Sequence, residues 1–495
     1  MEEGSRHGAP TTALATSERW ILRNGAGIQI METLAVGAFL TALAVELGAS
    51  NVVIGLLAAI PHLAQLGQIP ALALVARLRA RKRIYLVSGA IARPMLLVIA
   101  AAAFVPSPGW ALALIACAFA VRYVAGSFIA CSWSSWMRDL VPDSEMGRVF
   151  GARQKRMVGI AIVVSLAAAA FIDAWKAHVP LPPIAAYAVV YTLAFFGGAY
   201  SVWCSRRIVE PEMAPVPAGQ SVFGELLVPF RDRNYRRLIA FLASWSFAMN
   251  LAAPFFTVHM LKRMELDLLW VIGFGTLSQL AAFLMATRWG AIADRMSNKP
   301  VLGVCTPLFV LAVFAWTFTT MPEKHVLTVP LLIAIHIATG FASAGVTLAA
   351  GNIGLKLAPR GRATGYLAAI ALVNATAGGI AALIGGLSAD LFAASKLSLT
   401  VHWQGAGGQF DVRALDFSHW DFFFFFAAAF GLFAVHRLSL VRERGEVEEA
   451  EVLRELVTSA RQGLRGLSTV AGLRAATEFP VAMVLGALRR DRERD

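Results

Sequence analysis

The chain has 495 residues, of which 58% are hydrophobic and 15% are charged, and its formal net charge is +13. A soluble protein carries roughly 45–50% apolar and about 25% charged residues. The composition therefore excludes an ordinary soluble protein and predicts a polytopic membrane protein. No nucleic-acid partner is expected, because the basic residues lie in short loops and form no patch interleaved with aromatic side chains.

Apolar segments long enough to cross a bilayer, about 20 residues each, follow one another along the chain. Twelve spans are predicted, at residues 25–46, 51–75, 84–105, 109–131, 157–175, 184–205, 237–261, 267–288, 300–320, 326–350, 363–394 and 420–437. The predicted fold class is all-α and integral to the membrane, with lipid as its surroundings.

The Lys and Arg residues are distributed unevenly between the two sides of this threading. Of the 44, 36 fall on the side that holds both termini. Because cytoplasmic loops carry the excess of basic residues, both termini are predicted to be cytoplasmic. The first twenty residues lack the apolar core of a cleavable signal peptide, so the first span is expected to act as its own insertion signal in a bacterial-type inner (plasma) membrane.

The chain divides into five predicted segments. They are a cytoplasmic N-terminal tail (1–20), an N-terminal six-helix half (21–205), a Pro-containing cytoplasmic linker (206–236), a C-terminal six-helix half (237–441) and a cytoplasmic amphipathic tail (442–495). In the last of these, apolar residues recur at helical spacing, namely Leu453, Leu456, Val457, Ala460, Leu464 and Leu467. Between spans eleven and twelve, residues 398–404 and 409–413 are expected to pair as a hairpin around residues 405–408.

The two halves resemble each other, which predicts a duplication with pseudo-symmetric halves. The loop after span four begins at Pro142 and the loop after span ten at Pro359, and each contains a Gly-Arg pair. These pairs end at Arg148 and Arg362, and an alignment that superimposes them places Arg122 opposite His336. Parallel repeats of six spans are typical of one class of secondary transporter.

Two motifs are similar to those of the major facilitator superfamily, and the resemblance covers roughly residues 20–440. Between spans eight and nine, the sequence Gly290-Ala-Ile-Ala-Asp294-Arg295-Met-Ser-Asn-Lys299-Pro300 is similar to the cytoplasmic gate motif G-x-L-a-D-R-x-G-r-k. In span four, Arg122-Tyr-Val-Ala-Gly126 is similar to the R-x-x-q-G motif, in which the Arg is associated with proton coupling. The superfamily's antiporter signature is missing from span five, which weakens the case for an exporter.

The resemblance implies a cytoplasmic gate formed by Gly290, Asp294, Arg295 and Lys299. The matching loop of the first half, residues 74–83, contains no acidic residue. Asp294 is therefore expected to make the ion pairs of the gate alone. Arg148 and Arg362 are either its partners or ordinary positive charges of cytoplasmic loops.

In this family, spans one, four, seven and ten line the central cavity. The polar residues near the middle of these spans are Gln29, Glu32, Arg122, Asn250 and His336. An ionised side chain at the bilayer centre costs roughly 2.5–3.5 kcal/mol, so the presence of Glu32 and Arg122 there needs an explanation. Either they form an ion pair that is broken and remade during transport, or they are a structural tie between packed helices.

Two further candidates each have a purely structural alternative. His336 is either a second proton carrier or a core histidine bonded to a backbone carbonyl, and Asn250 is either a ligand contact or a helix–helix hydrogen bond. No catalytic, nucleotide-binding or Cys/His metal motif is present in the sequence. We therefore expect no enzymatic activity, no cofactor and no metal site.

The predicted function is secondary active transport of a small organic solute by alternating access, coupled to protons through Glu32 and Arg122. A monomer is expected. The alternative is a non-transporting member of the same superfamily that acts as an assembly factor or sensor through residues 442–495. An organic anion, a zwitterion and an amphipathic drug all remain open as substrate, as does the direction of transport.

Overall fold

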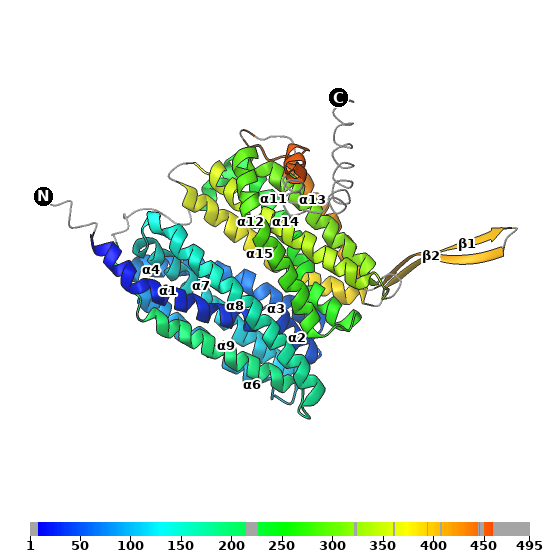
Figure 1. Ribbon diagram of the computed structural model, residues 1–495, viewed down its shortest axis with the longest axis horizontal. Helices are drawn as coiled ribbons and strands as arrows, with labels where there is room; N and C mark the ends of the chain where they lie inside the picture. Colours follow the sequence, from blue (N-terminus) through cyan, green and yellow to red (C-terminus); the bar gives the residue numbers. More distant parts are fainter. Residues whose placement is uncertain are drawn as a thin grey trace, which may run out of the picture.

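The computed structural model describes residues 8–213, 226–320, 324–359, 362–393, 395–405, 408–418, 420–443, 445 and 450–458. Within this part of the chain, twelve helices are long and apolar enough to cross a membrane, and they coincide with the twelve predicted spans. The all-α membrane fold is confirmed. Figure 1 shows the N-terminal and C-terminal halves as two bundles packed side by side.

The N-terminal half consists of nine α-helical segments and a short 3₁₀ turn, η1. Their bounds are α1 (Gly8–Ala35), α2 (Ala38–Glu46), α3 (Asn51–Leu63), η1 (Ala64–Gly67), α4 (Gln68–Leu78), α5 (Arg81–Ala92), α6 (Met95–Ala102), α7 (Pro108–Leu140), α8 (Asp143–His178) and α9 (Ile184–Ser205). Helix α1 begins at Gly8, so it includes most of the predicted N-terminal tail of residues 1–20. Leu14, Ser17 and Trp20 are buried against the bundle, so the helix gains packing well before the apolar span begins.

The first long helix of the C-terminal half begins at Arg233, and the spans of this half have fewer breaks. Its elements are η2 (Val228–Arg231), α11 (Arg233–Val258), η3 (His259–Arg263), α12 (Leu268–Met296), α13 (Asn298–Ala315), η4 (Trp316–Thr320), α14 (Thr328–Leu357), α15 (Ala363–Phe392), β1 (Lys396–Gly405), β2 (Gly408–Ser418) and α16 (Trp420–Ser439). The predicted hairpin is confirmed, with Gln404 paired to Gln409 in antiparallel register. It projects from one end of the bundle (Figure 1).

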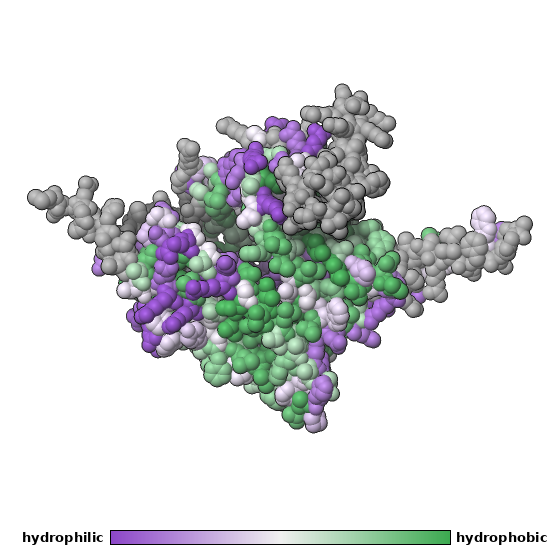
Figure 2. Space-filling view, in the orientation of Figure 1, coloured by the Kyte–Doolittle hydropathy of each residue, from purple (hydrophilic) through white to green (hydrophobic). Residues whose placement is uncertain are grey.

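The molecule has two distinct ends. We call the end with the β1–β2 hairpin and the α2–α3, α6–α7 and η3–α12 connections the hairpin end. The other, with the α4–α5, α7–α8, α12–α13 and α14–α15 connections, is the basic end, since its loops hold the excess Lys and Arg. Figure 2 shows hydrophilic side chains gathered at helix ends and a hydrophobic area across the middle of this face, as a membrane-embedded bundle requires.

The halves are joined at the hairpin end and separate at the basic end. One cluster of buried apolar side chains at the hairpin end contains residues of both halves, including Phe39, Phe119, Phe255 and Phe274. At the basic end each half has a cluster of its own, around Tyr85 and Trp136 in the first half and around Tyr235 and Trp289 in the second. The two bundles therefore diverge toward the basic end.

The C-terminal ends of equivalent helices give an alignment of the two halves that differs from the predicted one. Helix α7 ends at Leu140 and α14 at Leu357, and Pro142 and Pro359 follow them at the same interval. The predicted alignment on the Gly-Arg pairs is wrong, because the second loop is shorter than the first between its Pro and its Gly-Arg pair. When the helix ends are superimposed, Arg122 corresponds to Thr339, and His336 corresponds to Phe119, which lies about one helical turn from Arg122.

Carboxylates at the basic end hold each half together internally. Glu210, which follows α9, accepts a hydrogen bond from the backbone N–H of Lys82 at 3.0 Å, and Glu443, which follows α16, accepts one from Lys299 at 2.7 Å. Lys82 and Lys299 are equivalent positions when the helix ends are superimposed. Each contact ties the sixth span of a half to the start of its third span.

The predicted amphipathic tail is partly within the described residues. Residues 450–458 are helical, and this helix packs on the second half through Val452, which is fully buried, and Leu456. The buried face of this helix therefore differs from the predicted apolar face, which included Leu453, because Leu453 is exposed. Ala460, Leu464 and Leu467 lie outside the described residues.

Candidate functional site

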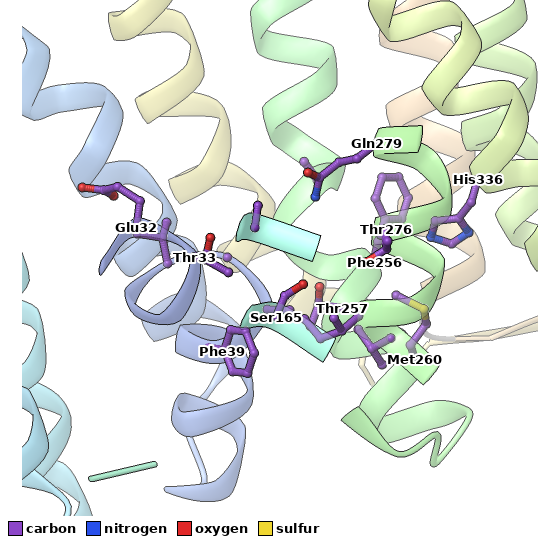
Figure 3. Close-up of a pocket in the computed structure, with 18 of the residues that line it drawn as sticks. Glu32, Thr33, Phe39, Ser165, Phe256, Thr257, Met260, Thr276, Gln279 and His336 are labelled. Atoms are coloured by element: carbon purple, nitrogen blue, oxygen red, sulfur yellow. The ribbon is translucent and has the colours of Figure 1, made fainter. Parts of the chain in front are cut away.

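A cavity of about 570 Å³ lies between the two halves. The first half contributes α1, α2 and α8, and the second contributes α11, α12 and α14. The polar side chains that line it are Gln29, Glu32, Thr33, Ser165, Thr257, Thr276, Gln279 and His336. In Figure 3, Glu32 and Thr33 lie on one side of the cavity, with Gln279, Thr276 and His336 on the other.

The first span is interrupted where it passes the cavity. Helix α1 ends at Ala35 and α2 begins at Ala38, and Gly37 between them has a φ of +64°. Only glycine adopts this conformation readily. Val36 and Gly37 line the cavity, so part of the cavity wall is non-helical backbone. Non-helical backbone at membrane depth is tolerated where it lines a cavity.

Glu32 and Arg122 form an ion pair between α1 and α7. The Nη2 atom of Arg122 donates a hydrogen bond to Oε1 of Glu32 at 2.6 Å. The Arg122 side chain is 3% exposed and that of Glu32 is 41% exposed. Arg122 also lies against Tyr123, with 4.9 Å between the guanidinium carbon and the ring centre. The pair thus has a buried cation in the first half and a carboxylate that lines the cavity.

His336 lies on the opposite side of the cavity and is held by three contacts. Its Nδ1 atom lies 2.8 Å from the carbonyl oxygen of Leu332, and because a carbonyl only accepts, Nδ1 carries a proton. The ring stacks on Phe274 and meets Trp316 edge-on. His336 is therefore both bonded to the backbone and part of the cavity wall, so the two interpretations of this residue are compatible.

Asn250 does not line the large cavity. Its Nδ2 atom donates to the carbonyl oxygen of Ser246 at 2.8 Å, and its side chain lies near that of His62 of α3. His62 and Asn250 line a neighbouring cavity of about 260 Å³, which shares Val36 and Gly37 with the first. The contact joins the two halves near the middle of their spans.

The structure brings only some of the predicted site residues together. Gln29, Glu32 and His336 line one cavity, whereas Arg122 reaches it only through Glu32. Sequence reasoning missed His62 and the hydroxyl and amide side chains of α8, α11 and α12, namely Ser165, Thr257, Thr276 and Gln279. These types are common in packed membrane helices, so only their position between the halves distinguishes them.

The predicted gate residues all lie at the basic end. Arg295 reaches Glu455 at 3.5 Å, and Asp294 is exposed. Arg148 pairs with Glu18 and Glu145, each at 2.6 Å, and not with Asp294.

The first glycine of the gate motif has space beside it. At Gly290 an added Cβ would lie 3.7 Å from Leu348, an ordinary contact. Arg362 precedes α15, with its backbone N–H bonded to the carbonyl oxygen of Pro359.

No cluster of three or more His, Cys, Asp or Glu side chains suited to a metal ion occurs among the described residues. The four cysteines are free thiols, and Cys204 and Cys305 are buried. None of the four lines the cavity between the halves.

Two six-helix halves with a polar cavity between them are the architecture of a membrane transporter. A model of the Major Facilitator Superfamily matches residues 25–386, and the chain belongs to this family. The predicted membership of this superfamily is thereby confirmed.

Solved structures with the same fold are distant in sequence. The nucleoside transporter NupG is 14% identical, with a TM-score of 0.62 over 86% of this chain and 100% of that one. A bacterial homologue of the iron transporter ferroportin in an inward-facing state is 9% identical, with a TM-score of 0.61 over 88% and 99%. A bacterial homologue of the human lysosomal transporter Spinster, inward-facing and unoccupied, is 13% identical, with a TM-score of 0.54 over 89% and 100%. No curated protein is similar enough in sequence to count as a relative.

Proposed function

We propose that the protein is a secondary active transporter that moves a small, polar, neutral or cationic organic solute across a bacterial-type inner membrane by alternating access. Proton coupling through Glu32 is part of the proposal. The observation that carries it is the placement of one ionisable carboxylate on the wall of an inter-half cavity, paired with an arginine that is buried behind it.

The cavity chemistry supports this solute class. Its lining contains two amides, four hydroxyls, one imidazole and one carboxylate, and no Lys or Arg side chain of the described residues lines it. Glu32 already neutralises the positive charge of Arg122. An anionic solute in the cavity would therefore meet the carboxylate of Glu32 and find no unpaired cation among the described residues of the wall. Neutral solutes rich in hydroxyl or amide groups can use the donors and acceptors of the wall, and an ammonium group can use Glu32. Of the three classes left open by the sequence, this argues against organic anions.

The Glu32–Arg122 pair supplies a physical route to coupling. A proton on Glu32 removes the negative charge next to Arg122 and leaves a buried guanidinium without its counter-charge. An unpaired buried charge is strongly destabilising, so protonation favours a rearrangement that gives Arg122 new partners or water. A cationic or hydrogen-bonding solute that approaches Glu32 competes for the same carboxylate, which links solute binding to proton binding.

The conformation suits the inward-facing state of an alternating-access cycle. If the basic end is cytoplasmic, as the Lys and Arg distribution predicts, the halves are closed on the outer side and apart on the inner side. Two of the structures with the same fold are described as inward-facing. In this state the gate around Asp294 is open, which explains why Arg148 has other partners.

A thermal-shift screen followed by flux measurements tests the proposal. Purified protein is exposed to size-matched neutral polyols and nucleosides, amines and carboxylates at several pH values, since a ligand stabilises the folded state that binds it. We expect stabilisation by neutral or cationic compounds, and its loss in the Thr276→Val and Gln279→Leu variants. Stabilisation by carboxylates alone would overturn the solute class. A stabilising compound that shows no counterflow in proteoliposomes would overturn transport.

A further inference from the structure

At the hairpin end, Asp390 of α15 reaches across to the first helix turn of α3 in the other half. Its carboxylate accepts hydrogen bonds from the backbone N–H of Asn51 at 3.2 Å, from that of Val52 at 3.1 Å and from Nδ2 of Asn51 at 2.7 Å. The first N–H groups of a helix have no partner within it. An α-helix of the first half is therefore capped by a side chain of the second.

Asp173 makes the reverse connection. It lies near the end of α8 in the first half and accepts hydrogen bonds from the backbone N–H groups of Leu268 at 3.2 Å and Leu269 at 2.7 Å, which begin α12 in the second half. The side chain of Asp267, at the N-cap position of α12, makes no capping hydrogen bond. Ser50 does cap α3 from within, through Val53. The start of α12 thus depends more on the opposite half than the start of α3 does.

The two contacts are related by the internal repeat. When the ends of α7 and α14 are superimposed, Asp173 falls on Asp390 and Asn51 falls on Leu268. At the basic end, Glu210 and Glu443 use the same chemistry, but each caps a helix of its own half. Carboxylate caps therefore cross between the halves at one end of the molecule and stay within a half at the other.

We propose that Asp173 and Asp390 are paired gate latches that close the hairpin end during the transport cycle. The inference rests on the proposed alternating-access function. To open this end, α12 must leave α8 and α3 must leave α15, so all five hydrogen bonds break together with the charge–helix-dipole attraction at both helix starts. The latches thereby favour the state that is closed at the hairpin end.

The Asp173 latch also lies on the way from the cavity to the hairpin end. Ser165 of α8 and Val271 of α12 line the cavity. Asp173 is about two helical turns beyond Ser165, and Leu268 about one turn before Val271. Separation of the two helices at this latch opens the cavity toward that end.

Accessibility of a cavity cysteine tests the latches without any substrate. In a background with all four native cysteines replaced by serine, Ile272→Cys on the cavity wall is labelled with a membrane-impermeant maleimide added from the hairpin side of oriented vesicles. Leu397→Cys, on the exposed β1 strand, reports that the reagent reaches this side. If each latch contributes as much as an ordinary helix cap, Asp173→Ala and Asp390→Ala each raise the labelling rate of Ile272→Cys about five-fold. The double variant multiplies the two effects to about 25-fold.

Two matched variants separate gating from general loss of stability. Asp267→Ala removes a carboxylate next to the Asp173 latch that makes no cap, and we expect no change in labelling. Glu443→Ala removes a buried carboxylate cap within one half, and we expect a lower melting temperature with unchanged labelling. If an alanine variant does not fold, Asp173→Asn and Asp390→Asn, which keep one acceptor oxygen, are expected to give smaller increases.

Equal labelling in the wild-type and double-latch proteins would overturn the proposal, and so would an equal increase with Asp267→Ala. The outcomes are distinguishable from failure of the proposed function. If the variants are labelled as expected but the protein moves no solute, the latch proposal stands and the transport proposal fails. If the protein transports solute but labelling is unchanged in the variants, only the latch proposal fails.

Discussion

The Nη2 atom of Arg122 lies 2.6 Å from Oε1 of Glu32, and the two side chains are 3% and 41% exposed. The cation is fixed inside the first half, while the carboxylate is within reach of water and solute in the cavity. A change in the charge of Glu32 therefore alters its electrostatic interaction with buried Arg122 and the charge on the cavity wall at the same time.

Replacement of Glu32 by Gln is expected to abolish gradient-driven accumulation while it preserves solute exchange. The amide cannot take up a proton at physiological pH but keeps a similar shape. Accumulation and counterflow in proteoliposomes with an imposed pH gradient measure the two activities. Glu46→Gln, which removes a carboxylate paired with Lys176 at the hairpin end, serves as the control and should leave accumulation intact. Unchanged gradient dependence in the Glu32→Gln protein would exclude the coupling role.

Replacement of Gly37 by Ala should destabilise the protein and weaken solute binding. The φ of +64° at Gly37 is unfavourable for alanine, at a cost of about 1–3 kcal/mol, although an added Cβ would meet no atom within 4 Å. The strain arises at the break in span one and distorts the cavity wall. Melting temperature and ligand-induced stabilisation are the measurements. Gly126→Ala, also with open space but within helix α7, should be neutral or slightly stabilising; equal losses in both variants would contradict the argument.

Replacement of Gly386 by Ala is expected to loosen the hairpin end. An added Cβ there would lie 2.5 Å from the carbonyl oxygen of Asn51 and 2.9 Å from the Cα atom of Val52. Because backbone atoms cannot move aside locally, α3 and α15 must separate. Labelling of Ile272→Cys from the hairpin side should increase. Gly159→Ala on α8, where an added Cβ has open space, should leave labelling unchanged, and a Gly386→Ala protein that labels like the wild type would argue against tight closure of this seam.

Glu443 should make the stability of the protein sensitive to acid. Burial raises the pKa of this carboxyl, but hydrogen bonds from Lys356, Asn298 and the N–H of Lys299 outweigh burial and hold its pKa below the ordinary value. A depressed folded-state pKa contributes stability above the unfolded pKa, and this contribution is lost as the pH falls through the folded pKa. We expect Glu443→Gln to lower the melting temperature at neutral pH and to reduce its further decline in acid. Melting curves from about pH 7 to about pH 4 measure both, and parallel curves for the two proteins would contradict the assignment.

Much of the fold follows from sequence, because each membrane span is a local property. A run of about 20 apolar residues must form a helix in a bilayer to satisfy its own backbone hydrogen bonds, and the Pro, Gly and loop motifs mark its ends. The β hairpin is local as well, since its turn and strand pattern set its register. A mid-span charge such as Glu32 or Arg122 is conspicuous because it is costly in lipid.

The partners of those helices depend on tertiary structure. Asp173, Asp390 and Glu443 bind backbone N–H groups, which nearly every residue possesses, so no sequence pattern indicates their targets. The rotation of each helix about its own axis is set by packing against its neighbours, and this rotation decides that Ser165 lines the cavity while Asn250 turns toward His62.

Sequence by itself determined the twelve spans, the duplication and the two mid-membrane charges, because hydropathy and charge act on each segment where it lies in the chain. Only the packing of one half against the other decided which polar groups meet across the seam and which end of the molecule is closed.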